Sequence, residues 1–234
     1  MDAKSIYKDG AYLAKNPSWH EEDSPWKAKQ IARMLSENNI SPSTVCEVGC
    51  GAGEILNCLT THYEANVQFC GYEISPQAFD ICKKKERPNL HFFLKDLLLD
   101  EAGSRFDVVM AIDVLEHVED YFAFLRRLRS RGEYEVFHIP LDLSVQWVLR
   151  SSPILKLRAT VGHIYYFTKE TALATLADTG YEVIDYFYTR GSLELSTSGW
   201  GPSVLKLPRK LLFSIHPDLA VRVLGGFSLL VLAR

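Results

Sequence analysis

Residues Thr44–Leu59 read T-V-C-E-V-G-C-G-A-G-E-I-L-N-C-L, and this stretch decides the fold. The β-branched run Thr44–Val48 predicts a buried strand, and apolar residues then recur at helical spacing, at Ile55, Leu56 and Leu59. The turn between them holds three glycines, Gly49, Gly51 and Gly53. Glycine permits positive φ and leaves no Cβ between the backbone amides and a ligand. The stretch therefore predicts the ligand-binding end of a strand-turn-helix unit.

The glycine spacing narrows the class of ligand. Counted from Gly49 and Gly51, a dinucleotide fingerprint G-x-G-x-x-G has its third glycine at position 54, where this chain has Glu54. A carboxylate there would repel a pyrophosphate. A P-loop is excluded because no Gly-Lys-Ser/Thr follows. What remains is an acidic residue, Glu47, followed by G-x-G-x-G, which suits a ligand that carries positive charge and no phosphate.

The segment E-V-G-C-G-A-G, residues 47–53, resembles motif I of the class I S-adenosylmethionine-dependent methyltransferases. In that family, an acidic residue and the glycine turn surround the aminoacid part of the cofactor. The resemblance implies S-adenosylmethionine as cofactor, because carboxylates can hold its ammonium, its sulfonium and its ribose diol. It assigns cofactor binding to Glu47, Gly49, Cys50, Gly51 and Gly53. The alternative is an ordinary glycine-rich turn between a strand and a helix.

Two further acids follow predicted strands. Val67–Glu73 reads as a second strand ending in Glu73, one strand-helix-strand step after Glu47, at about the interval where a carboxylate meets a ribose diol in such folds. Ile74 comes next. A third strand, Leu90–Lys95, is followed by Asp96 and Leu97. The resemblance implies that Asp96 binds the adenine amino group and that Leu97 offers a backbone amide and an apolar face to the ring. The alternative for Glu73 is a surface acid at the end of a strand, and the alternative for Asp96 is a helix or turn cap.

Residues Phe106–Asp120 read F-D-V-V-M-A-I-D-V-L-E-H-V-E-D and resemble motif IV of the same superfamily, particularly its quinone-biosynthesis and small-molecule O-methyltransferase branch. The apolar run Val108–Ile112 predicts a strand inside a parallel sheet, whose carboxyl end is where such sheets bind ligands. The resemblance implies that Asp113 lines the methyl-transfer site. His117 is a candidate catalytic residue, or, with Glu116, the first turn of a helix. These three side chains could share a cation, but they form no compact motif, and we expect no metal.

The second half of the chain predicts the remaining strands. Tyr134–Ile139 reads as a fifth strand, Tyr181–Thr189 as a sixth and Phe227–Ala233 as a seventh, with a helix over Thr168–Asp178. In the family, G-H-x-x-x-F-T recurs before this helix, and here it contains His163, a candidate general base or a loop-holding residue. The resemblance implies an α/β fold, a doubly wound Rossmann-like sheet in the order 3-2-1-4-5-7-6 with the last strand antiparallel and helices on both faces.

We expect a single domain over residues 1–234. An N-terminal arm and helix take 1–40, with Ser24 as N-cap and Pro25 at the first helical position. The arm, Met1–Asp23, is aromatic in a polar setting and is either a lid over the site or an ordinary terminus. The cofactor-binding core takes 41–190, and the segments 141–168 and 191–222 are expected to form the acceptor pocket.

Composition limits the function classes. At 234 residues and 47% hydrophobic content, the chain can bury one large core. The net charge of −3 gives no global attraction to nucleic acid, and the apolar stretch Val223–Ala233 is about half the ~20 residues that a membrane-spanning helix needs. Five cysteines without a C-x-x-C pair indicate reduced thiols. We expect a cytoplasmic monomer or homodimer that inserts into no membrane and binds no nucleic acid.

The predicted function is methyl transfer from S-adenosylmethionine to an oxygen of a small molecule, a sugar or a carboxylate, by direct displacement at the sulfonium methyl carbon. His163, His117 and Asp113 are the candidate catalytic residues. Methylation at nitrogen or carbon uses the same cofactor half and stays an alternative. So does a catalytically silent module that binds the cofactor or a partner. A nicotinamide oxidoreductase is disfavoured by the glycine spacing.

Overall fold

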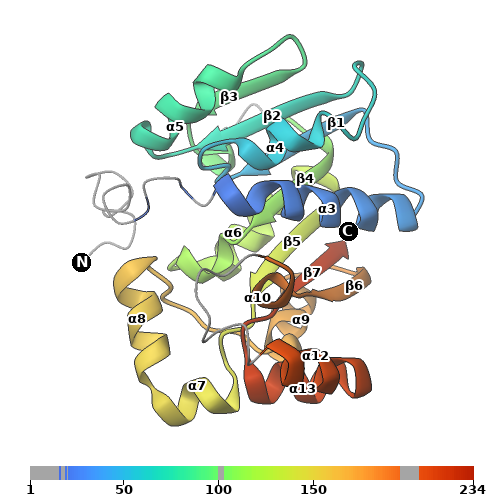
Figure 1. The fold of residues 1–234 in the computed structure, drawn as a ribbon. Helices are drawn as coiled ribbons and strands as arrows, with labels where there is room; N and C mark the ends of the chain where they lie inside the picture. The colour runs from blue at the N-terminus through green and yellow to red at the C-terminus, as the bar shows by residue number, and fades with distance from the viewer. Residues whose placement is uncertain (1–15, 17–18, 20, 100–102, 196–205) are drawn as a thin grey trace.

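The computed structural model describes residues 16, 19, 21–99, 103–195 and 206–234, and it contains one seven-stranded sheet (Figure 1). The strand order is β3-β2-β1-β4-β5-β7-β6. The strands are β1 (Thr44–Val48), β2 (Gln68–Glu73), β3 (Leu90–Leu94), β4 (Phe106–Ile112), β5 (Gly132–Pro140), β6 (Val183–Thr189) and β7 (Ser228–Ala233). Strand β7 pairs antiparallel with both β5 and β6, and the other pairings are parallel. The predicted fold class and strand order are confirmed.

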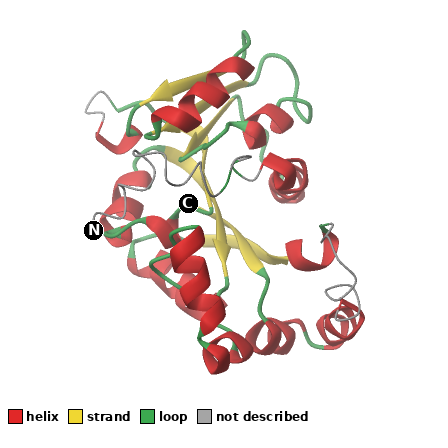
Figure 2. Ribbon diagram, turned by 60° about the vertical axis from the view of Figure 1, so that its left-hand side comes forward, coloured by secondary structure: helices red, strands yellow, loops and turns green. Residues whose placement is uncertain are grey.

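Helices cover both faces of the sheet (Figure 2). They are α3 (Ser24–Glu37), α4 (Glu54–Leu59), α5 (Pro76–Cys82), α6 (Tyr121–Leu128), α7 (Val145–Arg150), α8 (Ser152–Thr160), α9 (Lys169–Asp178), α10 (Gly191–Glu194), α12 (Lys206–Ile215) and α13 (Pro217–Leu224). Short 3₁₀ turns are η1 (Glu21–Asp23), η2 (Lys83–Lys85), η3 (Leu97–Leu99) and η4 (Leu115–His117). Within the described part of the chain, no helix has the length and apolar character needed to cross a bilayer.

Two buried clusters, one for each face of the sheet, form the core. Successive residues of β4 alternate between them, with Val109 in one cluster and Val108 and Met110 in the other, as the period of a strand requires. The first cluster also takes residues of α6 and α9, and the second takes residues of α3, α4 and α5. The sheet is therefore a middle layer between two helical layers, which explains the unbroken apolar run Val108–Ile112 in its central strand β4.

The predicted element ends are right to within a few residues. Thr168 is the N-cap of α9, as expected, and forms a capping box with Thr171. The N-cap of α3 is Asp23, one residue before the predicted Ser24, and its side chain makes no capping hydrogen bond. Pro25 therefore stands at the second helical position rather than the first. Helix α5 gives way to the 3₁₀ turn η2 after Cys82, and all five cysteines are free thiols.

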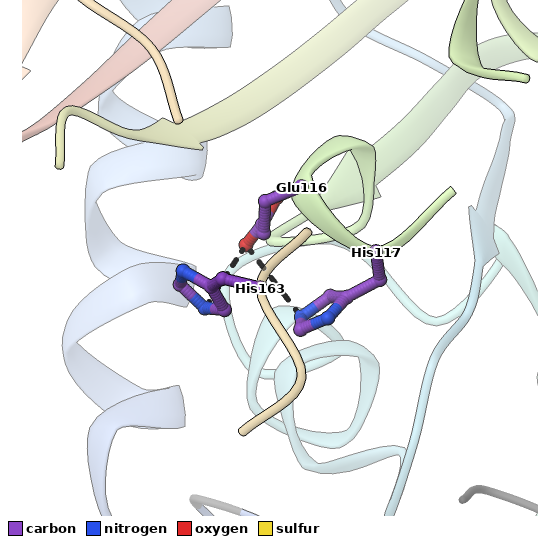
Figure 3. Close-up of side chains that lie close together, drawn as sticks. All are labelled: Glu116, His117 and His163. Atoms are coloured by element: carbon purple, nitrogen blue, oxygen red, sulfur yellow. Dashed lines mark ion pairs between the residues drawn. The ribbon is translucent and has the colours of Figure 1, made fainter. Parts of the chain in front are cut away.

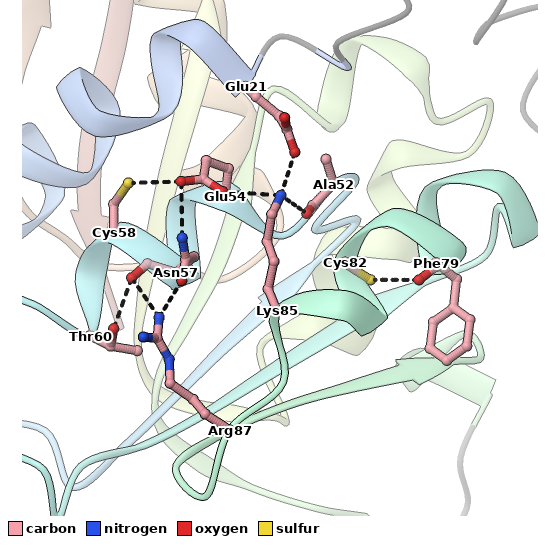
Figure 4. Close-up of polar contacts among 10 residues, drawn as sticks. All are labelled: Glu21, Ala52, Glu54, Asn57, Cys58, Thr60, Phe79, Cys82, Lys85 and Arg87. Atoms are coloured by element: carbon pink, nitrogen blue, oxygen red, sulfur yellow. Dashed lines mark hydrogen bonds and ion pairs between the residues drawn. The ribbon is translucent and has the colours of Figure 1, made fainter.

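The start of α4 is fixed by a lysine from the following unit (Figure 4). Lys85 Nζ donates to the carbonyl of Ala52 at 2.7 Å, pairs with Glu54 at 3.0 Å and also contacts Glu21. The glycine turn is held from its other side, because the amides of Gly49 and Cys50 both donate to the carbonyl of Tyr72 in β2. These contacts give the turn a defined shape before any ligand arrives.

Candidate active site

A cavity of about 530 Å³ opens at the carboxyl ends of β1, β2, β4 and β5. This volume lies in the range of roughly 300–1,000 Å³ that is usual for small-molecule sites. Most of the predicted site residues line it: Glu47, Gly49, Cys50, Gly51, Glu73, Ile74, Asp113, His117 and His163. Gly53, Asp96 and Leu97 do not line it. The cavity also has walls from the predicted acceptor segments, including Leu157 and Leu195.

The three glycines of the turn serve different purposes. All three have positive φ, between +53° and +74°. A Cβ on Gly51 would project toward the ring of Trp19, 3.6 Å away, and Gly51 borders the cavity. A Cβ on Gly53 would instead lie 2.5 Å from Phe92 and 2.8 Å from Cys82. Gly53 is thus required by the packing of α4 against β3 and α5, and in this structure it does not face the cavity.

The predicted adenine-binding pair lies outside the cavity. Asp96 accepts a hydrogen bond from the amide of Leu98 at 2.9 Å, as a turn cap would. Leu97 is fully buried in a core cluster, so no face of its side chain is open to a ring. The adenine role of these two residues stays a prediction. Because the Leu97 side chain is buried, an adenine ring would contact the backbone of this turn rather than that side chain.

Glu73 is a buried carboxylate that organises the second binding turn. One oxygen accepts from the amide of Gly51 at 2.8 Å, and the other accepts from the amides of Ile74 and Ser75 at 2.8 and 2.7 Å. Burial raises the pKa of Glu73, while these three amides favour its ionised form. The side chain therefore couples the glycine turn to the end of β2 and presents its remaining lone pairs at the cavity.

Glu47 lines the cavity and is 1% exposed. Its Oε2 accepts no hydrogen bond from any described residue. Burial raises the pKa of Glu47 well above its usual value, an effect that the charge of Lys27 opposes. A buried carboxyl oxygen without a donor is costly, and it is best explained by a ligand that supplies the missing positive charge or donor.

Asp113 is held by two basic side chains that the sequence analysis did not predict. Lys27 of α3 lies 2.7 Å from Asp113 Oδ2, and His138 Nδ1 of β5 lies 2.6 Å from Oδ1. His138 is held in turn by Thr189, 2.8 Å from its Nε2. Although burial disfavours the ionised form, these two partners lower the pKa of Asp113. Asp113 also has φ of +53°, an uncommon conformation for a residue other than glycine that is often found at functional sites.

Glu116, His117 and His163 form a compact cluster on the cavity wall (Figure 3). Both imidazoles turn their Nε2 atoms toward Glu116 Oε1, at 3.8 Å from His117 and 3.9 Å from His163. Glu116 is 0% exposed, and burial raises the pKa of its carboxyl well above the usual value. His163 Nδ1 lies 2.7 Å from Asp142 Oδ2, and His117 Nδ1 lies 3.1 Å from the carbonyl of Gly162. This cluster combines two bases and an acid in one place.

The expectation that Glu116 and His117 begin a helix is wrong in detail. They lie in the 3₁₀ turn η4, whose Glu116 carbonyl accepts from the amides of Ile164 and Tyr165 at 2.8 and 3.2 Å. These contacts bring the segment that follows α8 onto η4 and place His163 beside His117. A cation shared by Asp113, Glu116 and His117, which the sequence allows but does not lead us to expect, is disfavoured because Lys27 and His138 occupy both oxygens of Asp113.

Glu54 opposes a bound pyrophosphate less strongly than its position in the sequence suggests. The carboxylate of Glu54 pairs with Lys85 at 3.0 Å and accepts from Asn57 at 3.0 Å, so its charge is partly neutralised. Repulsion of a pyrophosphate by Glu54 is reduced accordingly. The glycine spacing and the buried Glu47 beneath the turn still distinguish this site from a dinucleotide fold.

A sheet in this order, with a glycine turn and a buried acid at the end of β1, defines the class I S-adenosylmethionine-dependent methyltransferases. A family model described as a methyltransferase domain matches residues 19–186. Because this match covers more than half of the chain, the protein belongs to that family: it is an S-adenosylmethionine-dependent methyltransferase, and S-adenosylmethionine is its cofactor.

Known proteins resemble part of the chain in sequence, and solved structures resemble it in fold. Ubiquinone biosynthesis O-methyltransferases from Rhodopseudomonas palustris (strain BisB18) and Coxiella burnetii (strain RSA 493 / Nine Mile phase I) are 34% identical over 110 residues and 26% identical over 101 residues. These matches cover 43% and 42% of this chain and 39% and 41% of the relatives, so the chain spans about two-fifths of their length.

Among solved structures, magnesium protoporphyrin IX methyltransferase from Synechocystis PCC 6803 with bound SAH has a TM-score of 0.65 at 18% identity, covering 99% of both chains. The N-methyltransferase NodS from Bradyrhizobium japonicum WM9, in complex with S-adenosyl-l-homocysteine, has a TM-score of 0.63 at 16% identity, covering 100% of this chain and 98% of its own. At this identity, the likeness concerns the fold alone.

Proposed function

We propose that this methyltransferase transfers the methyl group to an oxygen of a small-molecule acceptor. The Glu116–His117–His163 cluster on the cavity wall is the observation that carries this proposal. A hydroxyl is a weak nucleophile until it loses its proton, whereas a neutral amine attacks the methyl group without prior deprotonation. A site that gathers imidazoles and carboxylates beside the cofactor cavity therefore suits an oxygen acceptor. The O-methyltransferase names of the partial relatives agree with it.

The residues of the cavity fit the cofactor. When bound, S-adenosylmethionine supplies a methyl group activated by positively charged sulfur. The unpartnered Oε2 of Glu47 and the glycine turn would face its aminoacid part, and Glu73 would accept from its ribose diol. The half-buried Asp113, with its lowered pKa, lines the cavity as a carboxylate whose charge is balanced by Lys27.

The acceptor would bind on the side of the cavity formed by the segment after β5. Asp142, Leu157, Val161 and His163 line this side, which agrees with the acceptor role predicted for residues 141–168. The pair of Asp142 and His163 resembles a positioned base, because the carboxylate at Nδ1 fixes the ring and its tautomer. Alignment of the two reactants supplies the larger share of rate enhancement, about 7–11 kcal/mol in favourable cases.

The acceptor atom is tested with matched pairs of small molecules that differ only in one group, such as a phenol and the corresponding aniline. The enzyme is incubated with methyl-labelled S-adenosylmethionine, and labelled product is quantified for each member of a pair. We expect label on hydroxyl acceptors. Label on amines alone would overturn oxygen methylation, and absence of product with every pair, despite cofactor binding, would favour a silent module.

Replacing Glu73 tests the cofactor assignment. Glu73→Ala removes the proposed acceptor of the ribose diol, and loss of charge-assisted hydrogen bonds of about 1.5–3 kcal/mol corresponds to roughly 10–100-fold weaker binding. Calorimetric titration with S-adenosylmethionine measures this, with NAD as a negative control ligand. Glu64→Ala, an exposed acid, is the matched control. Wild-type affinity in both Glu73→Ala and the isosteric Glu73→Gln would refute the assignment.

Replacing His163 tests the activation of the acceptor. His163→Ala is expected to leave the affinity for S-adenosylmethionine within twofold and to lower kcat by about 10²–10⁴. His91→Ala, on the exposed side of β3, should leave both unchanged. Turnover of His163→Ala equal to that of the wild type would return His163 to a purely structural role.

A further inference from the structure

The geometry of the Glu116–His117–His163 cluster is that of metal ligands rather than of partners in hydrogen bonds. One atom from each side chain contributes to a group in which all the atoms lie within 4.8 Å of one another. The two Nε2 atoms approach the same carboxylate oxygen, at 3.8 and 3.9 Å, which is too long for a hydrogen bond. Figure 3 shows the three side chains converging on one point from η4 and from the segment after α8.

The other ring nitrogen of each histidine fixes its tautomer. His163 Nδ1 lies against the Asp142 carboxylate, and His117 Nδ1 lies against the Gly162 carbonyl. Both partners only accept, so in the neutral rings Nδ1 carries the hydrogen and Nε2 carries the lone pair. A carboxylate or carbonyl behind the Nδ1 hydrogen is the usual outer partner of a metal-binding histidine. Both Nε2 lone pairs therefore face the cluster centre.

Glu116 provides an independent indication of a missing ligand. Its side chain is 0% exposed, and neither carboxylate oxygen accepts a hydrogen bond from any described residue. A buried carboxyl group in this condition carries the full penalty of desolvation. A cation between Glu116 and the two Nε2 atoms would offset that penalty and explain why the fold tolerates the group.

We propose that Glu116, His117 and His163 bind a divalent first-row transition metal ion. Two imidazoles and one carboxylate suit zinc, manganese, iron or cobalt, and three protein ligands leave positions for an acceptor molecule. Ligand atoms about 2.1 Å from a tetrahedral ion lie roughly 3.4 Å apart, so the ion would draw the three side chains inward by about 1 Å or less. This site departs from the expectation that no metal is needed.

The role of the ion rests on the proposed oxygen methylation. The ion binds the acceptor oxygen and lowers the pKa of its hydroxyl, and the proton leaves to bulk water. The oxygen then forms its bond to the methyl carbon while the carbon–sulfur bond breaks, and the electron pair of that bond stays on sulfur. In this scheme His163 is a metal ligand and not a general base, because its Nε2 lone pair is used by the ion.

Metal binding is measured directly, without turnover. The full chain is stripped with a chelator and titrated with Co²⁺, whose visible absorption reports the geometry of its ligands, and zinc or manganese is counted by mass spectrometry. We expect one ion per chain. Glu116→Gln and His163→Ala should weaken Co²⁺ binding more than about 100-fold, and Asp142→Asn, which removes only an outer partner, should weaken it about 10–100-fold. His91→Ala is the matched control and should bind like the wild type.

Failure of this site is distinguishable from failure of the proposed function. Absence of Co²⁺ binding by the wild type, or equal binding by Glu116→Gln and His163→Ala, would overturn the site whatever the acceptor is. If Glu116→Gln does not fold, as judged by circular dichroism and S-adenosylmethionine affinity, His117→Ala takes its place. Turnover that survives exhaustive chelation would also overturn the role of the ion and would support His163 as a base.

Discussion

At the scale of single residues, the buried acids of this protein fall into two groups. Glu73 and the half-buried Asp113 have donors on both carboxyl oxygens, from three backbone amides in the first case and from Lys27 and His138 in the second. Glu47, Glu116 and Glu135 have carboxyl oxygens that accept nothing from the described residues. The first two of these line the cavity, where a ligand can supply the missing charge. Glu135 lies outside it.

Glu135 therefore makes stability depend on pH. Burial raises its pKa to about 8, against the opposing charges of Arg129 and Arg105. An unfolded glutamate titrates near ~4.3, so between roughly pH 4.3 and 8 the folded chain keeps a proton that the unfolded chain has released. The free energy of unfolding consequently falls as pH rises through this window, by up to about 1.4 kcal/mol per unit.

Glu135→Gln should remove the contribution of Glu135 to this slope, of up to about 1.4 kcal/mol per unit, and make the protein more stable than the wild type at about pH 8, as measured by urea denaturation across the window. Glu133→Gln, an exposed neighbour on the same strand, is the control and should keep the wild-type slope. A slope in Glu135→Gln equal to that of the wild type would contradict the raised pKa.

At the scale of elements, the glycine turn between β1 and α4 combines two requirements. Gly51 borders the cavity, while Gly53 lets α4 pack against Phe92 and Cys82. Both adopt positive φ. A substitution at Gly53 is thus expected to act through stability and not through direct contact with the cofactor.

Gly53→Ala should lower the free energy of unfolding by at least about 2 kcal/mol, because it adds strain at positive φ to overpacking at Phe92. Chemical denaturation measures this. Gly191→Ala provides the control, since a Cβ there would be 3.5 Å from Leu195, at ordinary contact distance. A Gly53→Ala protein as stable as the wild type would show that α4 shifts freely.

Most elements could be predicted from local pattern, but the partners of the site residues could not. Turn and cap residues such as Thr168 act within a few positions of the chain, so their roles are visible in sequence. The contacts of Asp113 with Lys27 and His138 depend on how α3, β4 and β5 meet. The sequence does contain one indication of the contact made by Lys27. This residue stands four positions before Ile31, within the apolar stripe of α3, where a lysine needs a buried acidic partner.

At the scale of the whole molecule, the strand order could be predicted only because the glycine and motif IV segments resemble a known family. Periodicity alone predicts strands but not their neighbours. The acceptor side of the cavity also depends on the fold. Asp142 and His163 lie far from Glu116 in sequence, and His163 comes close to Glu116 because the segment after α8 bonds to η4. The sequence predicts the segment 141–168 as part of the acceptor pocket, but it does not predict the contacts of His163 with Asp142 and Glu116.

Strand β7 pairs the edge strand β6 with the rest of the sheet and is buried on both faces. Leu232→Ala, at a fully buried position of β7, should lower the free energy of unfolding by about 2–5 kcal/mol. Leu149→Ala, at a position 79% exposed in α7, should change it by less than about 0.5 kcal/mol. Equal effects in urea denaturation would mean that β7 contributes little to the core.

The place of β7 between β5 and β6 has a consequence for synthesis on the ribosome. Strand β6 has no neighbour in the sheet until β7 has been made, about 40 residues later. At about 5–20 residues per second, the nascent chain waits roughly 2–8 s with the edges of β5 and β6 unpaired. During this interval the growing polypeptide presents two open strand edges, which are the surfaces that chaperones and aggregation compete for.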